Sequence, residues 1–305
     1  MSAAEIGFQA LLRWLLFPAI AVPVCLYARA RGHHGFMERL GAWLLIIPVA
    51  LGASFLGRAT FLSLLAACGM VAAWELARIG QPLPLRAPRA LASFAVSPAR
   101  FAAALACALP WLFWADRSPA FPLALALLAA IAPLALFLAL PRATAVTWSI
   151  PLLPLSLGAS LSFWILLQRM PGGFRWVLLA FSVVVLNDVM GFLTGRFVPG
   201  PHPFPGLSPG KTVTGYAGGI ITGILVAFIL AFAVPEFDTA KLAAAGLLLA
   251  CSGAAGDLVA SAVKRRHSAK DFSRVLGAQG GMLDRLDSLL GAGWVFYLFL
   301  RAMTG

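Results

Sequence analysis

The chain has 305 residues, of which 61% are hydrophobic and only 11% are charged, and its formal net charge is +12. Soluble domains are about half apolar and about a quarter charged, so this balance excludes an ordinary soluble protein and indicates an integral membrane protein. In such a protein an excess of basic residues reports topology, and we expect no nucleic-acid partner.

Apolar runs of roughly 15 to 22 residues follow one another along the chain, each near the length that crosses a ~30 Å hydrocarbon core. Runs of this length favour helices over the ~10-residue alternating strands of a barrel. The expected fold class is therefore all-α, a polytopic membrane protein with about nine or ten transmembrane helices. The predicted spans are 9–28, 41–56, 59–79, 101–115, 119–140, 148–168, 174–195, 216–234, 241–262 and 289–303.

Basic residues concentrate in alternate loops, which include 196–215 with two and 263–288 with six, the largest number in any loop. By the positive-inside rule these loops face the cytoplasm, which places both chain ends on the far side. We expect residues 1–147 to anchor and pack the protein, and residues 148–305 to form a C-terminal catalytic module with both loops. The expected location is the bacterial cytoplasmic (inner) membrane, with the active site on the cytoplasmic side.

Isolated polar and sulfur-containing residues occur in the apolar runs. Glu75 is expected either to form a local ion pair with Arg78 or to line a cavity. The four cysteines show no C-x-x-C spacing and are interpreted as small buried hydrophobes: Cys25, Cys68, Cys107 and Cys251.

The first chemistry appears in the run 174–195, which places Asp188 inside an apolar helix. A carboxylate at such a depth is costly and normally faces a polar cavity or a partner. Gly191 and Gly195 share the helix face of Asp188. This face predicts either a close contact with another helix or access for a ligand phosphate.

The following loop is rich in proline and glycine and contains Ser208, Lys211 and Thr212. It is not a Walker A motif, because Pro205 stands where a glycine is required and no strand can precede it. Exposed amides, a lysine and hydroxyls just before a helix that starts near 212–216 predict a phosphate-binding corner.

The stretch 256–288 holds the densest charge in the chain. Asp257, Ser261 and Lys264 share one helix face, and Asp284 and Asp287 share a face at the start of the next helix. Carboxylates without histidine or cysteine suit Mg²⁺, and a second cation is left open. The candidate metal ligands are Asp257, Asp284, Asp287 and Asp188.

Basic residues and two glycines complete this stretch. Gly280 and Gly281 are expected to permit a tight turn or close approach to a phosphate. A set of basic side chains predicts a polyphosphate pocket: Lys264, Arg265, Lys270 and Arg285. The alternative, a topology-setting basic loop, accounts well for two further residues, Arg266 and Arg274.

The C-terminal segment, roughly the last 130 residues, resembles the phosphatidate cytidylyltransferases, also called CDP-diacylglycerol synthases. The long family pattern combines S-x-x-K-R, K-D and G-G-x-x-D-R-x-D, and it is matched here by Ser261, Lys264, Arg265, Lys270, Asp271, Gly280, Gly281, Asp284, Arg285 and Asp287. Gly256 to Leu258 match the family's upstream G-D-L. Ser208 to Gly215 match its S-P-x-K-T-x-x-G loop.

The resemblance and the residues together imply CMP transfer from CTP to phosphatidic acid or a related phospho-lipid, with Mg²⁺ as cofactor. Asp257, Asp284, Lys264 and Arg265 would be catalytic. Substrate-binding roles are implied for Ser208, Lys211, Thr212, Ser261, Lys270, Gly280, Gly281 and Arg285.

One position departs from the family pattern: Gln279 stands where the family has a histidine. Glutamine does not titrate near neutral pH, but an already ionised phosphate needs little proton abstraction, so we expect activity to persist. Alternatives that stay open are another phospho-lipid acceptor, a CTP-dependent lipid kinase, and a transporter or scaffold. Contact with membrane lipids is expected, and a homodimer is left open.

Overall fold

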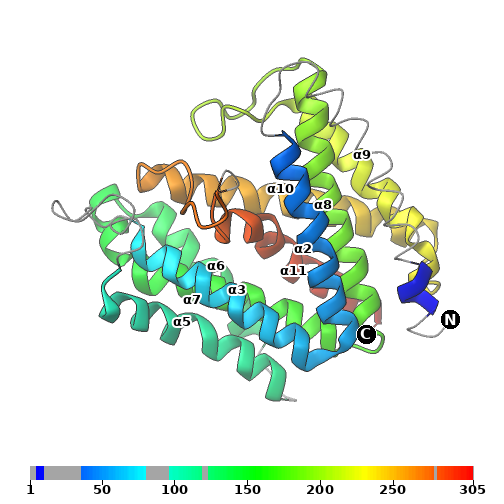
Figure 1. Cartoon of the computed structure of the whole chain (residues 1–305), viewed down its shortest axis with the longest axis horizontal. Helices are drawn as coiled ribbons and strands as arrows, with labels where there is room; N and C mark the ends of the chain where they lie inside the picture. The colour runs from blue at the N-terminus through cyan, green and yellow to red at the C-terminus, as the bar shows by residue number, and fades with distance from the viewer. Residues whose placement is uncertain (1–4, 10–35, 80–95, 119–122, 278–279, 305) are drawn as a thin grey trace.

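The computed structural model describes the chain apart from residues 1–4, 10–35, 80–95, 119–122, 278–279 and 305. The described residues form helices and connections without any strand, so the all-α prediction is confirmed. In chain order the helices are α2 (Phe36–Leu56), α3 (Arg58–Arg78), α5 (Pro98–Arg117), α6 (Leu123–Ala139), α7 (Arg142–Arg169), α8 (Gly173–Phe197), α9 (Val213–Ile229), the short η1 (Ala231–Ala233), α10 (Thr239–Arg266) and α11 (Leu283–Thr304) (Figure 1).

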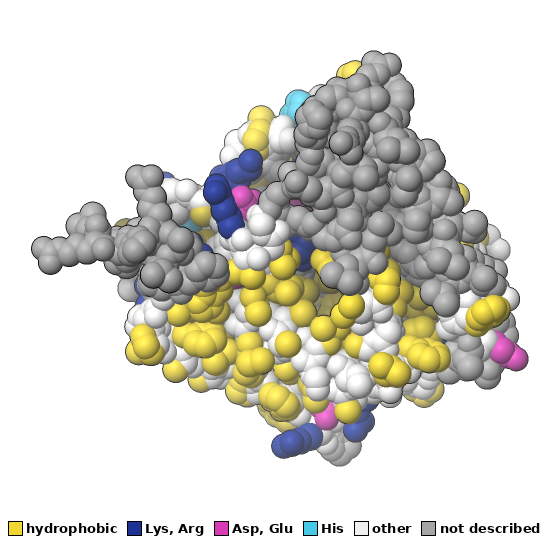
Figure 2. Space-filling model, viewed as in Figure 1, with side chains coloured by type: hydrophobic (Ala, Val, Ile, Leu, Met, Phe, Trp, Pro, Cys, Tyr) yellow, Lys and Arg dark blue, Asp and Glu magenta, His cyan; other side chains and the backbone are white. Residues whose placement is uncertain are grey.

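Each predicted span from 41–56 onward coincides with a helix, whereas the span 9–28 lies almost wholly outside the described residues. Six helices in the described part are long and apolar enough to cross a membrane, and three apolar helices are shorter. The protein is therefore a polytopic membrane protein, and the number nine or ten stays a prediction. Figure 2 shows hydrophobic side chains spread over the described surface in view, as lipid contact requires.

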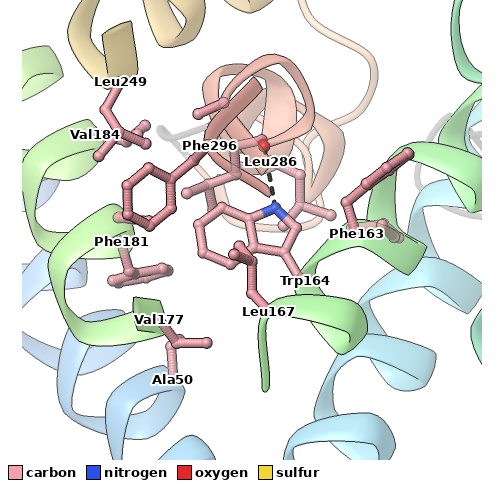
Figure 3. Packing of buried hydrophobic residues seen from close by; sticks show 14 of the residues in the cluster. Ala50, Phe163, Trp164, Leu167, Val177, Phe181, Val184, Leu249, Leu286 and Phe296 are labelled. Atoms are coloured by element: carbon pink, nitrogen blue, oxygen red, sulfur yellow. Dashed lines mark hydrogen bonds between the residues drawn. The ribbon is translucent and has the colours of Figure 1, made fainter. Parts of the chain in front are cut away.

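Aromatic and aliphatic side chains pack where α7, α8, α10 and α11 meet (Figure 3). Trp164 of α7 is buried there, and its Nε1 donates to the carbonyl of Leu289 on α11 at 3.1 Å. Phe181 and Phe296 surround this indole from α8 and α11. A buried indole with its one donor satisfied fixes α11 against α7.

Glycines bring α8 and α9 into close contact. A Cβ added to Gly215 on α9 would lie 2.7 Å from the carbonyl oxygen of Gly191 on α8, and Gly195 faces the same part of α9. The predicted small-residue face is therefore a helix-packing contact. It brings Asp188 on α8 to the N-terminal end of α9.

Candidate active site

The proline-rich connection after α8 leads Lys211 to the start of α9. Thr212 caps this helix, and its Oγ1 accepts a hydrogen bond from the Gly215 amide at 3.1 Å. The Val213 amide donates to the carbonyl of Pro201 at 2.9 Å, which fastens the connection to the helix end. The predicted helix start near 212–216 is confirmed.

Lys211 forms an ion pair with Asp257 of α10, with 2.9 Å between Nζ and Oδ2. Burial alone would lower the pKa of Lys211, but the charges of Asp257 and Asp188 outweigh this effect and raise that pKa above its ordinary value. The ammonium also lies 5.7 Å from the centre of the Tyr216 ring. Lys211 therefore stays charged at neutral pH.

A cavity of about 250 Å³ with several polar side chains in its lining, called the polar cavity below, opens beside this ion pair. Its lining includes Ser208, Thr212 and Asp188, all predicted from the sequence. Tyr216 and Asn187 line it as well and were not predicted; the Tyr216 hydroxyl is buried without a hydrogen-bond partner. In the sequence, Asn187 is next to Asp188 and Tyr216 follows Lys211 within the same segment, and this proximity could have indicated that they belong to the site.

Three carboxylates from three helices meet next to the cavity. Asp188 of α8, Asp257 of α10 and Asp287 of α11 lie close enough for their charges to act on one another. Close approach of α10 and α11 explains the meeting, because a Cβ on Gly256 would lie 2.5 Å from the carbonyl oxygen of Asp287. The charge of Arg285 also acts on Asp188. The structure thus brings three of the four predicted metal ligands together.

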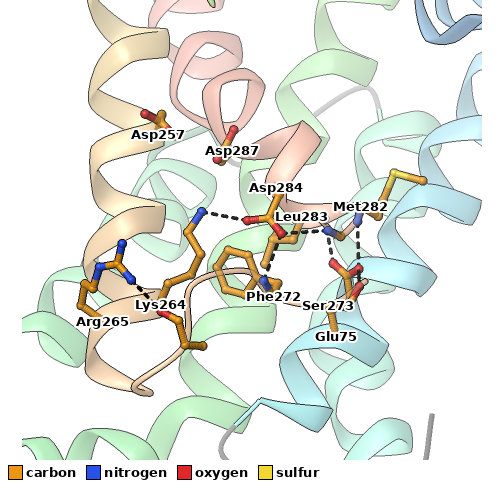
Figure 4. A network of polar contacts seen from close by, with 12 residues as sticks. Glu75, Asp257, Lys264, Arg265, Phe272, Ser273, Met282, Leu283, Asp284 and Asp287 are labelled. Carbon is orange, nitrogen blue, oxygen red and sulfur yellow. Dashed lines mark hydrogen bonds and ion pairs between the residues drawn. The ribbon is translucent and has the colours of Figure 1, made fainter. Parts of the chain in front are cut away.

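Asp284, the fourth, lies in a separate set of contacts (Figure 4). Its Oδ1 pairs with Nζ of Lys264 at 2.8 Å, and the two side chains are only 6% and 10% exposed. Its Oδ2 accepts from the amides of Phe272 at 3.0 Å and Gly281 at 2.8 Å. Asp284 therefore joins the first turn of α11 to α10 and to the connection 267–282.

Glu75 of α3 completes the other side of these contacts, although the sequence predicted a local partner or a cavity. It is fully buried. Its Oε1 accepts from Ser273 Oγ at 2.5 Å and from the Met282 amide at 2.8 Å, and its Oε2 accepts from the Leu283 amide at 2.8 Å. Arg78 instead lies 5.5 Å over the Trp74 ring.

The glycine pair lies between the two carboxylates. Gly280 has a φ of 81°, a conformation that favours glycine, and its added Cβ would lie 2.8 Å from Oδ2 of Asp284. A Cβ on Gly281 would meet the Glu75 carboxylate. The predicted tight turn is present, and the close neighbours are carboxylates of the chain itself. Gln279 lies outside the described residues.

The remaining predicted residues are more exposed or are engaged elsewhere. Arg265 donates to the carbonyls of Leu207 at 3.2 Å and Ala269 at 3.1 Å, which ties α10 to the connection before α9. Lys270 is exposed on the connection 267–282, whereas Ser261 is buried on α10. Arg266 donates to carbonyls at the end of α6, as expected for a residue outside the chemistry.

An apolar cavity of about 550 Å³ lies beside one of the three carboxylates. Side chains of α6, α7, α10 and α11 line it, and Asp287 and Gly256 belong to its wall. Ile131 and Leu248 at this cavity are 45% and 37% exposed, so it opens on the apolar surface. Cys251 also lines it and is exposed, so the expected burial is wrong for this cysteine: its helix face borders an open cavity.

Comparison with known proteins gives one family and several relatives. A family model described as the cytidylyltransferase family matches residues 37–303. The "Uncharacterized protein YnbB" of Escherichia coli K12 is 36% identical over 141 residues, 45% of this chain and 47% of that protein. A phosphatidate cytidylyltransferase of Brucella abortus is 36% identical over 141 residues, 46% of this chain and 52% of the relative.

A phosphatidate cytidylyltransferase of Staphylococcus saprophyticus is similar to the same extent, 36% identical over 132 residues, which are 43% of this chain and 50% of the relative. The aligned part of the chain thus spans about half the length of these curated relatives.

Proposed function

The chain belongs to the cytidylyltransferase family, and on this premise we propose that it transfers CMP from CTP to phosphatidic acid, giving CDP-diacylglycerol and pyrophosphate. One observation carries the proposal: Asp188 lines the polar cavity, Asp287 lines the apolar cavity, and the charges of these two carboxylates act on each other. Nucleotide phosphates require polar surroundings and acyl chains require apolar ones. A reaction that joins a nucleotide to a lipid needs both beside one site.

The reaction needs one new bond and one broken bond. A phosphate oxygen of phosphatidic acid attacks the α-phosphorus of CTP, the bond from that phosphorus to the bridging oxygen breaks, and pyrophosphate leaves with the electron pair. Because the attacking phosphate is already ionised, positioning and charge neutralisation provide most of the catalysis. Lys211 and Lys264 supply positive charge, while Ser208 and Thr212 line the nucleotide side.

The carboxylates of the site suit Mg²⁺ if two of them act together with substrate phosphates and water. Within the described part of the chain, no group of three or more His, Cys, Asp or Glu residues is arranged so that it could hold a metal ion by itself. Mg²⁺ commonly takes one or two protein carboxylates and completes its shell with substrate phosphates and water. We propose that Asp257 and Asp287 would hold it, with Asp188 in support, and that Asp284 positions Lys264. The ion would neutralise charge on the transferred phosphate.

The proposed setting is the inner membrane of a bacterium, with the polar cavity on the cytoplasmic side. The six basic residues of 263–288, together with Arg196 and Lys211, support this orientation. Phosphatidic acid would then enter from the cytoplasmic leaflet through the apolar cavity.

Labelled CTP tests the proposal directly. Purified protein is incubated with Mg²⁺, phosphatidic acid and CTP labelled at either the α- or the γ-phosphorus, and lipid products are identified by mass. We expect α-label on the lipid and γ-label in pyrophosphate. Label from the γ-position on the lipid would indicate a lipid kinase instead, and absence of both CTP binding and transfer would indicate a transporter or scaffold.

The identity of the acceptor is tested by a panel of phospho-lipids in the same assay. Phosphatidic acid should give the highest kcat/KM, and a different preferred acceptor would refute that part of the proposal.

Lys211→Met should lower transfer strongly, whereas Lys241→Met should not, because Lys241 pairs with Asp238 in an exposed position.

A further inference from the structure

Glu75 contacts the beginning of the helix that carries two of the aspartates. The first amides of an α-helix have no partner within the helix and attract negative charge. In α11 these amides belong to Met282 and Leu283, and both donate to Glu75, a carboxylate some two hundred residues earlier in the chain, at 2.8 Å each. Glu75 therefore caps α11 from α3.

Among the residues that the structure describes, every hydrogen-bond partner of Glu75 is a donor. Oε1 accepts from the Ser273 hydroxyl and the Met282 amide, and Oε2 accepts from the Leu283 amide. A glutamine of the same size would turn an NH₂ group toward one of these donors and leave at least one buried amide without an acceptor. The contact is therefore specific for a carboxylate.

The cap fixes the place at which α11 begins. Gly281 lies against the Glu75 carboxylate, and its amide donates to Asp284, so the same turn is held from two sides. Asp284 and Asp287 follow within the first two turns of α11, one holding Lys264 and the other facing the apolar cavity. A shift of this turn would move both carboxylates together.

We propose that Glu75 is a positioning residue for the proposed CMP transfer: by capping α11 it sets the locations of Asp284 and Asp287. This inference rests on the proposed function and adds a residue of the N-terminal half to the site. Glu75 is not itself a lining residue of either cavity, and its contact with α11 runs through the amides of Met282 and Leu283.

The test compares Glu75→Gln with Glu236→Gln, the same substitution at an exposed carboxylate paired with Arg175. We expect Glu75→Gln to lower kcat by about tenfold or more, with KM for CTP changed by less than about threefold. Hydrogen exchange should accelerate in peptides of 272–288 and stay unchanged in peptides of α8 and α9. Glu236→Gln should alter none of these quantities.

A milder variant guards against misfolding. Ser273→Ala removes one donor to Glu75 and leaves the cap on α11, so it should fold and give a smaller fall in kcat. Unchanged kcat and unchanged hydrogen exchange in Glu75→Gln would overturn the proposal. Faster exchange throughout the protein in both variants would also overturn it, because Glu75 would then stabilise the whole fold and not specifically the start of α11. Loss of CMP transfer by the wild-type protein would instead refute the proposed function.

Discussion

Replacing Lys264 with methionine would leave Asp284 without its ammonium partner in a buried site. The side chains of this pair are 10% and 6% exposed, and Nζ lies 2.8 Å from Oδ1, so water cannot replace the lost charge. Removing one partner of a buried ion pair costs ~3–5 kcal/mol. Asp284 keeps two amide donors, so we expect a loss at the lower end of this range. A loss of about 3 kcal/mol raises the equilibrium constant for unfolding by more than about a hundredfold.

The measurement is unfolding of the purified variant in mixed micelles with increasing SDS, followed by tryptophan fluorescence. Lys241→Met is the matched control, since Lys241 lies 3.9 Å from Asp238 and their side chains are 39% and 64% exposed. Its expected loss is below about 1 kcal/mol. Adding Asp284→Asn to Lys264→Met should restore part of the stability by removing the buried charge. Equal losses in the two single variants would refute the reasoning from burial.

Three further changes test other parts of the structure. Gly256→Leu should lower stability by about 1–3 kcal/mol and reduce activity, because even a Cβ would lie 2.5 Å from a backbone carbonyl of α11; Gly210→Ala, in open space, should be neutral in the same SDS titration. Asp257→Asn should reduce CMP transfer by about a hundredfold at saturating Mg²⁺, and near-wild-type turnover would contradict its metal role. Burial lowers the pKa of His267 from its ordinary 6.5, so the unfolded chain binds more protons below that value. The contribution of His267 to stability should be full above about pH 6.5 and be lost as the pH decreases, and this loss should be smaller in His267→Gln.

Helix positions and the main carboxylates could be predicted because they depend on local patterns. An apolar run sets the length of a helix, and an aspartate inside such a run stands out as costly. Asp188 and Asp257 were recognised in this way, Asp287 was recognised from its place at the start of the next helix, and the structure brings the three together. The start of α9, predicted near 212–216 after the proline- and glycine-rich loop, follows the capping residue Thr212 in the structure.

Contacts between distant helices could not be predicted from one sequence. Glu75 is as unusual in its apolar run as Asp188, but nothing near it in the chain indicates that its partners begin at Ser273. The separation of Asp284 from the other carboxylates depends on how α10 and α11 cross, and helical periodicity does not determine a crossing. The four predicted metal ligands could be chosen by residue type from the sequence, but their spatial grouping required the structure.

The apolar cavity beside Asp287 has a consequence for how rate depends on concentration. Its exposed rim residues, such as Ile131 and Leu248, face the same apolar surroundings as the rest of the bundle. An acceptor that arrives this way travels in two dimensions and never dissolves in water. Turnover should therefore follow the mole fraction of acceptor lipid in the bilayer or micelle, and adding inert detergent at constant total acceptor should slow the enzyme by surface dilution.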